Sequence, residues 1–336
     1  FKKDPSIPHI MVTLDTSFEN NAQLIKSLME AGMNVARINC AHGNEKNWRS
    51  LIEAVHNASD KSGRACKIYM DIAGPKMRVD LPGKGKDKGK LKVSLGQEIL
   101  LVESGEEIER NQEVISCFEH GVFTHLKDGE RIIIDDGKIE GIVINKNGSN
   151  HLKITRISSK KPFIKKEKGL NLPDTQITLE ALTKVDLKVI PFIAKNADLV
   201  GCSFLRTAKD VKLIKNKLKK YNNNPKLILK IETPEAVINL PSLLLEAMTE
   251  ESFGVMIARG DLAVEIGFER LSEIQDEILW ICEAAHAPVI WATQVLETYS
   301  KSGFATRSEI TDAAHAAKAE CVMLNKGDYI VDTIKL

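Results

Sequence analysis

Two stretches near the middle of the chain decide the fold: KLILKIETPEAV at residues 226–237 and GVMIARGDLAVEIG at residues 254–267. Each begins with a short apolar run, which predicts a buried strand. The first run reaches Lys230 and then Glu232, and the second leads into Asp261. In a parallel α/β sheet or barrel the carboxyl ends of all strands open onto one face, so these charges are expected to converge there.

An ammonium beside two carboxylates predicts a site for a hard divalent cation and an anionic substrate. A small number of oxygen ligands suits Mg²⁺ or Mn²⁺, with the remaining positions left for water or substrate oxygens. The alternative is a surface Lys-Glu pair and an aspartate that caps a helix. Because the charges follow adjacent predicted strands, the sequence favours the site.

Composition limits the classes of function. The chain has 336 residues, 43% of them hydrophobic, which leaves room for a (β/α)₈ barrel of about 250 residues and an inserted module. The net charge is +1, so no overall field favours nucleic acid or an acidic membrane surface. The six cysteines form no CxxC pair, and no apolar run reaches about 18 residues, so we expect a cytoplasmic protein with free thiols that does not enter membranes.

Periodicity along the chain predicts alternating strands and helices. The predicted strands are 10–14, 35–39, 66–71, 198–203, 227–231, 253–258, 288–292 and 320–324. Helical spacing of apolar residues occurs at 19–32, around Trp48–Val55, and at 179–195, 208–220, 270–286 and 307–318. Three strands come before a change of pattern and five after it, which predicts a closed (β/α)₈ TIM barrel rather than an open sheet.

The change of pattern begins near residue 80. The segment LPGKGKDKGK at 81–90 has almost nothing to bury and predicts a loop or hinge. Residues 91–157 show short alternating runs broken by Asp-Gly and Asn-Gly turns. We therefore predict a small antiparallel β-barrel domain, inserted after strand 3 as a lid. The expected boundaries are 1–79 and 168–336 for the barrel and 80–167 for the insert.

The predicted strand ends are more polar than the strands that lead to them. Besides the three charges named above they carry Arg37, Asn39, Asp71, Ser203, Thr293 and Asn325. Ser203 and Thr293 can also serve only to hydrogen-bond a loop. No second histidine lies at ligand spacing from His42, which favours a loop histidine over a metal ligand.

Six motifs follow one another along the chain: NVARINCAHG at 34–43, MDIAGPKMRV at 70–79, EKGLNLP at 167–173, KIETPEAV at 230–237, GVMIARGDLAVEIG at 254–267 and WATQVLE at 291–297. In sequence and in order they resemble the motifs of the pyruvate kinase family. The predicted β insert falls where that family keeps its mobile B domain. The resemblance covers essentially the whole chain, except that the family's C-terminal domain has no counterpart, so regulation by sugar phosphates is not expected.

The resemblance implies phosphate transfer from phosphoenolpyruvate to ADP, giving pyruvate and ATP, with Mg²⁺ or Mn²⁺. Lys230 looks like the lysine that stabilises the phosphoryl group in flight, and Glu232 and Asp261 look like the metal ligands. Arg37 and Arg78 would bind the transferred phosphate and the nucleotide, because guanidinium groups suit phosphate oxygens.

Other family positions carry over in the same way. Backbone amides near Ala258, Arg259 and Gly260, together with Asp261, would hold the substrate carboxylate at a helix start. Thr293 resembles a threonine near the enolate face that receives a proton. Asn39, His42 and Lys168 match positions on the phosphate and nucleotide side.

Departures from the family pattern also carry information. Lys76 stands where potassium-dependent members have glutamate, and Ala41 and Ile72 replace two residues near the monovalent cation. A fixed ammonium can supply the charge of K⁺, so we expect no potassium requirement. The family's SGET motif after strand eight is replaced by residues 325–328, a loop linked to proton delivery.

Two other functions stay open. A divergent paralogue on the same barrel would act on another 2-oxo acid or enolate, for example by metal-assisted decarboxylation. A catalytically weak protein would bind nucleotide or 2-oxo acid as a regulator, although Lys230 is not needed for binding alone. A homo-oligomer is possible under each reading.

Overall fold

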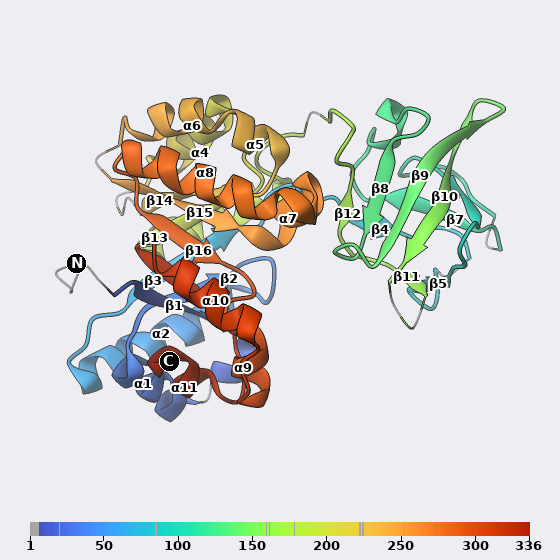
Figure 1. Ribbon diagram of the computed structural model, residues 1–336. Coiled ribbons are helices and arrows are strands. Elements are labelled where there is room, and N and C mark those ends of the chain that lie inside the picture. The colour runs from blue at the N-terminus through green and yellow to red at the C-terminus, as the bar shows by residue number, and fades with distance from the viewer. Residues whose placement is uncertain are drawn as a thin grey trace. The chain divides into compact units, whose positions relative to one another are not determined.

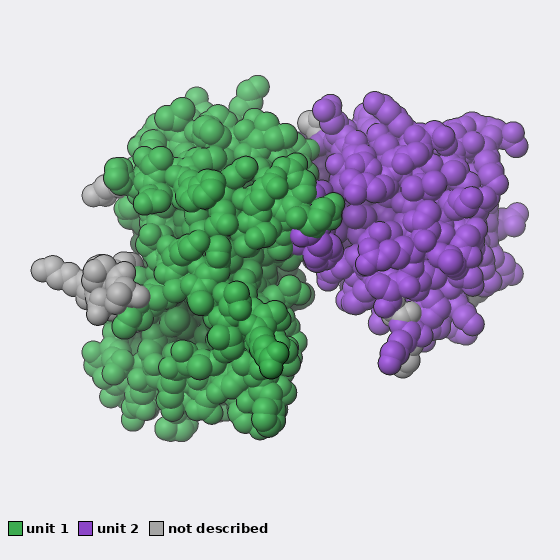
Figure 2. Space-filling view, in the orientation of Figure 1, with its two compact units in different colours: residues 1–74, 181–262, 269–336 green, residues 75–180, 263–268 purple. Residues whose placement is uncertain are grey.

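The chain divides into two compact units, coloured separately in Figure 2. Unit 1 comprises residues 1–74, 181–262 and 269–336, and unit 2 comprises residues 75–180 and 263–268. The computed structural model describes residues 7–19, 21–84, 86–109, 111–158, 160, 162–177, 179–221, 223, 225–250 and 252–336. The boundaries expected for the insert, 80 and 167, lie inside unit 2. Residues 263–268, which were not expected to belong to the insert, also join it.

Unit 1 is a closed barrel of eight parallel strands in the order β1-β17-β16-β15-β14-β13-β3-β2 (Figure 1). The bounds are β1 (His9–Leu14), β2 (Met33–Asn39), β3 (Lys67–Ile72), β13 (Leu199–Cys202), β14 (Lys226–Ile231), β15 (Phe253–Ala258), β16 (Val289–Ala292) and β17 (Cys321–Leu324). The predicted TIM barrel is therefore confirmed.

Helices cover the outside of the barrel (Figure 1). The bounds are α1 (Ala22–Ala31), α2 (Glu45–Ser62), α3 (Lys184–Asn196), α4 (Ala208–Leu218), α5 (Pro234–Ile238), α6 (Leu240–Ala247), α7 (Arg259–Ile266), α8 (Leu271–Ala284), α9 (Glu297–Ser302), α10 (Arg307–Ala316) and α11 (Ile330–Lys335). Short 3₁₀ turns occupy Thr16–Phe18, Phe123–His125 and Phe268–Arg270. None of the described helices is both long and apolar enough to cross a membrane.

The sequence placed the start of α3 too early. We expected a helix from residue 179, but it begins at Lys184, because Thr183 and Asp186 form a capping box there. The short helices α5 and α6 were missed altogether. Each starts with a proline in its first turn, where proline is tolerated, and they are only 5 and 8 residues long.

The interior of the barrel is filled by inward-facing side chains from most of its strands. They include Met11, Val35, Tyr69, Ile228, Met256, Ile290 and Met323. All six cysteines are free thiols, as expected. This packed interior fixes the strands, so the residues at their carboxyl ends stand on a rigid support.

Unit 2 contains a seven-stranded sheet in the order β12-β8-β9-β10-β6-β7-β4 and a two-stranded sheet of β11 and β5. The bounds are β4 (Val79–Asp80), β5 (Lys90–Lys92), β6 (Glu98–Leu101), β7 (Val114–Cys117), β8 (Arg131–Ile134), β9 (Ile139–Lys146), β10 (Ser149–Ile157), β11 (Phe163–Lys165) and β12 (Leu170–Asn171). Asn147 and Gly148, both at positive φ, make the predicted Asn-Gly turn between β9 and β10. One pair, β6 and β7, runs parallel, so the unit is not antiparallel throughout.

Candidate active site

Four neighbouring strands of the barrel bring a group of charged side chains to one rim. The strands β14, β13, β3 and β2 are adjacent and parallel, so their carboxyl ends lie together. They carry Lys230, Asp71 and Arg37, and Ser203 and Glu232 directly follow β13 and β14. The expected convergence of strand-end charges is present for this half of the barrel.

Lys230 is buried at the centre of this group. Its Nζ lies 2.7 Å from Ser203 Oγ, 3.0 Å from Glu232 Oε1 and 3.5 Å from Asp71 Oδ1. Burial alone would lower the pKa of Lys230, but the charges of Asp71 and Glu232 outweigh it, and the pKa is raised above its usual value. Lys230 is therefore a fixed positive charge.

Arg37 and Asp71 form a second, nearly buried pair. The Nε and Nη2 atoms of Arg37 lie 2.7 and 2.5 Å from Asp71 Oδ2, and its Nη1 donates to Thr13 Oγ1 at 2.9 Å. Burial would raise the pKa of Asp71, but the charges of Arg37 and Lys230 prevail and the pKa is lowered. Asp71 thus holds two cations at once.

Glu232 is held by both its partner cation and the backbone. Its Oε2 accepts a hydrogen bond from the Phe204 amide at 2.8 Å, and Phe204 adopts a positive φ of 54° to donate it. Burial raises the pKa of Glu232 despite Lys230, and the negative charge of Asp261 raises it further. Asp261, in the first turn of α7, is therefore close enough to act on Glu232 electrostatically.

The other half of the rim is built differently. Thr293, the residue after β16, has a φ of 69°, a left-handed conformation that is rare for a β-branched residue. Its Oγ1 donates to the carbonyl of Ala292 at 2.7 Å. A Cβ added to Gly260 would lie 3.5 Å from Thr293 Cγ2, so the start of α7 and the threonine are neighbours. Ala258, at the end of β15, is buried beneath them.

The side chain of Arg259 holds this strained segment. Its Nε donates to the carbonyl of Ala292 at 2.9 Å, and its Nη2 donates to the carbonyl of Thr293. Asp312 binds the same guanidinium with contacts of 2.5 and 3.0 Å, and the indole of Trp291 lies 4.7 Å from the guanidinium carbon. Four hydrogen bonds thus hold the Arg259 guanidinium against Ala292, Thr293 and Asp312.

Two residues that were predicted for the phosphate and nucleotide side, Asn39 and His42, lie at the end of β2 and just after it. The Asn39 side chain accepts a hydrogen bond from the Ala41 amide at 3.1 Å and shapes the turn after the strand. His42 is exposed, and its carbonyl accepts a hydrogen bond from Trp48 Nε1 at 2.8 Å. Neither side chain makes a described contact with the Lys230 group.

Three of the predicted site residues belong to unit 2. Arg78 donates to the carbonyl of Glu167 at 2.9 Å, and Lys168 lies 3.3 Å from Asp135. Lys76 lies beside the backbone of Gly169, where an added Cβ would be 3.2 Å from its Cε. Within unit 2 these side chains are ordered by local contacts.

The loop after β17 is packed tightly. A Cβ on Gly327 would lie 2.1 Å from the carbonyl oxygen of Ser300 in α9, so only glycine fits. Lys326 forms an ion pair with Asp15, which follows β1. Asp328 is exposed and is the one carboxylic acid in residues 325–328.

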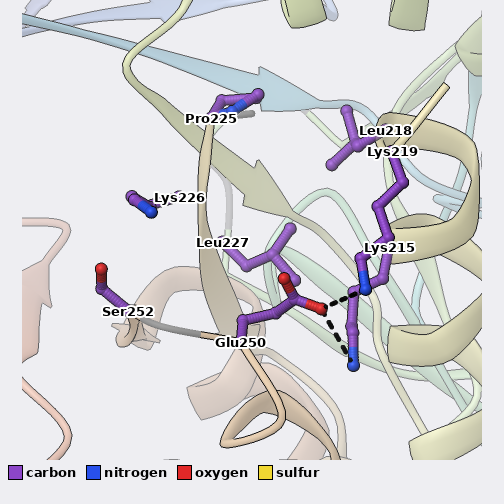
Figure 3. A pocket seen from close by; sticks show the side chains of 8 residues that line it. All are labelled: Lys215, Leu218, Lys219, Pro225, Lys226, Leu227, Glu250 and Ser252. Atoms are coloured by element: carbon purple, nitrogen blue, oxygen red, sulfur yellow. Dashed lines mark ion pairs between the residues drawn. The ribbon is translucent and has the colours of Figure 1, made fainter. Parts of the chain in front are cut away.

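Two cavities of unit 1 lie away from this rim. The hollow in Figure 3 lies at the start of β14, where Lys215 and Lys219 approach Glu250 at 3.4 and 2.9 Å. Its volume of about 10 Å³ has no room for a substrate. A larger cavity of about 700 Å³ is lined by Trp280 and Val289, at the start of β16. Both lie at the amino ends of the strands, opposite the charged rim.

Sequence reasoning missed several residues of the site. Tyr69 and Thr13 contact Asp71 and Arg37 from within the barrel, and Asp312 acts through Arg259. Tyr69 stands two residues before Asp71 in one strand, so the alternation of strand side chains was a usable signal. Nothing in the sequence pairs Asp312 with Arg259, which are 53 residues apart.

Comparison with known proteins gives a consistent result along the chain. Residues 8–334 match the family described as "Pyruvate kinase, barrel domain". The chain is 34% identical over 336 residues to a pyruvate kinase of Dictyostelium discoideum, with 97% of this chain and 64% of that protein covered. It is 32% identical to one of Sporosarcina psychrophila, with 97% and 55% covered, and 31% identical to pyruvate kinase 2 of Saccharomyces cerevisiae, with 94% and 62% covered.

The match covers only part of each of these relatives. The chain spans about 55 to 64% of the length of the first two of these relatives. Within that span, the barrel, the insert after β3 and the six motifs occur together. The chain belongs to the pyruvate kinase family.

Proposed function

We propose that the protein transfers the phosphoryl group of phosphoenolpyruvate to ADP, yielding pyruvate and ATP. The observation that carries the proposal is the buried Lys230 ammonium, which lies within 3.5 Å of Ser203, Glu232 and Asp71 at the rim of the barrel. Phosphoryl transfer is catalysed mainly by positioning and by stabilising negative charge. A fixed cation on a rigid strand end is suited to both tasks.

Lys230 and Arg37 would act on the transferred phosphoryl group. Lys230 would neutralise the charge that spreads over its oxygens in the transition state. Arg37 would bind the same oxygens with the part of its guanidinium that Asp71 and Thr13 leave free. Because both cations are held by Asp71, they need no reorganisation when the reaction begins.

The carboxylates of Glu232 and Asp261 fit a divalent metal ion. Burial and the negative charge of Asp261 raise the pKa of Glu232, so ionisation of both carboxylates is unfavourable unless a cation lies beside them. Two carboxylates without nitrogen or sulfur ligands suit Mg²⁺ or Mn²⁺. Such an ion would supply Lewis-acid charge at the phosphoryl and enolate oxygens, and Glu232 and Asp261 would hold it in place.

The start of α7 and Thr293 would serve the enolate. Amides near Ala258, Arg259 and Gly260 open a helix, where the dipole favours a carboxylate. Thr293, next to Gly260, would stand on the side of the enolate carbon that takes up a proton. The left-handed backbone of Thr293 supports this role, since strained residues of this kind cluster at active sites.

The remaining positions are proposed for the nucleotide and for charge balance. Asn39, His42, Arg78 and Lys168 would contact phosphate or nucleotide groups. Lys76 would supply the positive charge that a bound K⁺ provides elsewhere in the family, so that potassium is not required. Its position against Gly169 supports a fixed rather than a mobile ammonium.

The proposal is tested by an assay for pyruvate with phosphoenolpyruvate, ADP and Mg²⁺ or Mn²⁺, in the presence and absence of K⁺. We expect pyruvate and ATP in equal amounts, dependent on the divalent metal. Pyruvate without ATP would indicate simple hydrolysis. No pyruvate at all, with the metal bound, would refute the proposal.

The loop after β17 favours one second candidate, an enzyme of the same barrel that acts on another 2-oxo acid or enolate. The loop offers only the exposed Asp328 as an acid, and Lys326 is paired with Asp15. A proton donor is needed to complete pyruvate formation but not to remove carbon dioxide from a 2-oxo acid with a β-carboxylate. Release of carbon dioxide from such a substrate, with no pyruvate from phosphoenolpyruvate, would favour this candidate.

A further inference from the structure

Tyr69 brings a hydroxyl into the cluster of apolar side chains that fills the barrel. It lies in β3, two residues before Asp71, and its side chain is fully buried. Its hydroxyl donates to Asp71 Oδ1 at 2.8 Å, and Met256 Sδ lies 3.9 Å away. A phenylalanine would fill the same space without a polar group to satisfy, so the hydroxyl calls for an explanation.

A second strand is adapted to this hydroxyl. A Cβ added to Gly201 in β13 would lie 2.0 Å from the Tyr69 hydroxyl and 2.1 Å from Asp71 Oδ1. No side chain can occupy that position while the phenol and the carboxylate remain in place. Glycine at 201 therefore makes room for the contact between Tyr69 and Asp71.

Because of this contact, the two oxygens of the Asp71 carboxylate accept hydrogen bonds from different donors. Oδ2 accepts the hydrogen bond from Arg37 Nε at 2.7 Å, while Oδ1 accepts the one from Tyr69. Lys230 stays 3.5 Å from Oδ1 and makes its shorter contacts elsewhere, at 2.7 Å to Ser203 and 3.0 Å to Glu232. Burial and the nearby charge of Asp71 raise the pKa of Tyr69 well above its usual value, so the phenol remains a donor.

We propose that Tyr69 is a positioning residue: its hydroxyl fixes the Asp71 carboxylate, so that Lys230 stays with Ser203 and Glu232 instead of closing onto Asp71. Without the hydroxyl, Oδ1 is a buried acceptor that lacks a donor, and the Lys230 ammonium is the nearest group that can satisfy it. Only the importance of Lys230 for phosphoryl transfer rests on the proposed function. The placement of Lys230 by Tyr69 does not.

The kinetic test uses Tyr69→Phe, which removes one oxygen and keeps the ring. We expect kcat to fall about 10- to 100-fold, the size of one lost hydrogen bond to a charged group, while the KM for Mn²⁺ is unchanged. The matched control is Tyr221→Phe, because Tyr221 follows α4 at the amino ends of the strands. The control should keep the wild-type kcat.

A second readout does not depend on activity. In protein labelled with ¹⁵N-lysine, the Lys230 ammonium signal is identified by its loss in Lys230→Met. We expect this signal to shift in Tyr69→Phe and to stay in place in Tyr221→Phe. Should Tyr69→Phe fail to fold, Gly201→Ala displaces the hydroxyl by another route and should shift the same signal.

The outcomes separate the two proposals. A wild-type protein that forms no pyruvate would refute the proposed function, yet the lysine signal would still report on Tyr69. An unchanged Lys230 signal in folded Tyr69→Phe or Gly201→Ala protein would overturn the positioning role. A shifted signal with kcat within about twofold of wild type would support the placement of Lys230 by Tyr69 and would overturn the importance of that placement for catalysis.

Discussion

The two halves of the barrel rim are built by different means. At the ends of β2, β3, β13 and β14, side chains hold one another through ion pairs centred on Asp71 and Lys230. At the ends of β15 and β16, a strained backbone at Thr293 is held by the Arg259 guanidinium. The contacts in the first half position charged side chains, and those in the second half position the backbone around Thr293. In the function that we propose, the first half acts on the phosphoryl group and the second on the enolate.

The largest effect is expected in the charged half. Lys230→Met should lower the rate of pyruvate formation by about 10³-fold or more, because no other side chain can replace its charge. Binding of Mn²⁺, followed by electron paramagnetic resonance, should survive, since Glu232 and Asp261 are untouched. A variant that kept more than about a tenth of the wild-type rate would have lost only about 1.4 kcal/mol, which would contradict the role.

The next effect is expected in the strained half. Arg259→Met removes the donors to the Ala292 and Thr293 carbonyls, so Thr293 should relax from its left-handed conformation. We expect kcat to fall about 10- to 100-fold, because a small displacement of a reacting group is costly. Asp312→Asn keeps the size of the side chain that contacts Arg259 and should have a smaller effect of the same kind. Equal rates in Arg259→Met and the wild type would show that the contacts of Arg259 are only structural.

The sequence predicts the charged half of the rim better than the strained half. Charges at strand ends are visible in the sequence, and Lys230, Glu232 and Arg37 were expected together for that reason. The left-handed Thr293 and the positive φ of Phe204 were not predictable, because a left-handed conformation there is imposed by tertiary contacts that no local signal announces. The use of the Arg259 side chain against Asp312 also depends on a contact between distant helices.

The fold shows the same contrast. Strand periodicity located all eight barrel strands, since buried parallel strands are continuous apolar runs. The helix α5 has five residues, too few to show a helical period. The helix α6 does space Leu240, Leu243, Leu244 and Ala247 at helical intervals, and this signal was overlooked. The parallel pairing of β6 and β7 within the insert depends on long-range register, which alternation alone does not determine.

The charged half should also make stability depend on pH. Asp71 has a pKa lowered by Arg37 and Lys230 against the effect of burial. Its pairing therefore stabilises the fold above about pH 4, the unfolded value, and is lost as the pH falls toward the folded pKa. Asp71→Asn should lose about 3 to 5 kcal/mol at pH 7, the usual result of breaking a buried pair.

Urea denaturation of the wild type and Asp71→Asn at a series of pH values measures this dependence. The difference in unfolding free energy should shrink steadily below about pH 4, as the wild-type carboxylate becomes protonated. Asp332→Asn, at an exposed ion pair with Lys335, is the control and should show almost no difference at any pH. A constant difference down to pH 2 would contradict the linkage.

The smallest effect is expected on adding potassium. With Lys76 supplying the charge, turnover in a buffer free of monovalent metal ions should be close to its maximum, and K⁺ should change it little. Lys76→Glu should be slow in the same buffer and should be activated by K⁺. Strong activation of the wild type by K⁺ would refute the replacement of the cation by Lys76.

The most direct test of the division between the two halves measures both steps in the same variants. Phosphoryl transfer is followed as formation of ATP from phosphoenolpyruvate and ADP, and proton transfer as exchange of the pyruvate methyl protons into D₂O with Mg²⁺ present. Lys230→Met should lose phosphoryl transfer by about 10³-fold and keep most of the methyl exchange, whereas Arg259→Met should lose mainly the exchange. A parallel loss of both steps in each variant would contradict the account, because the two halves would then act as a single unit.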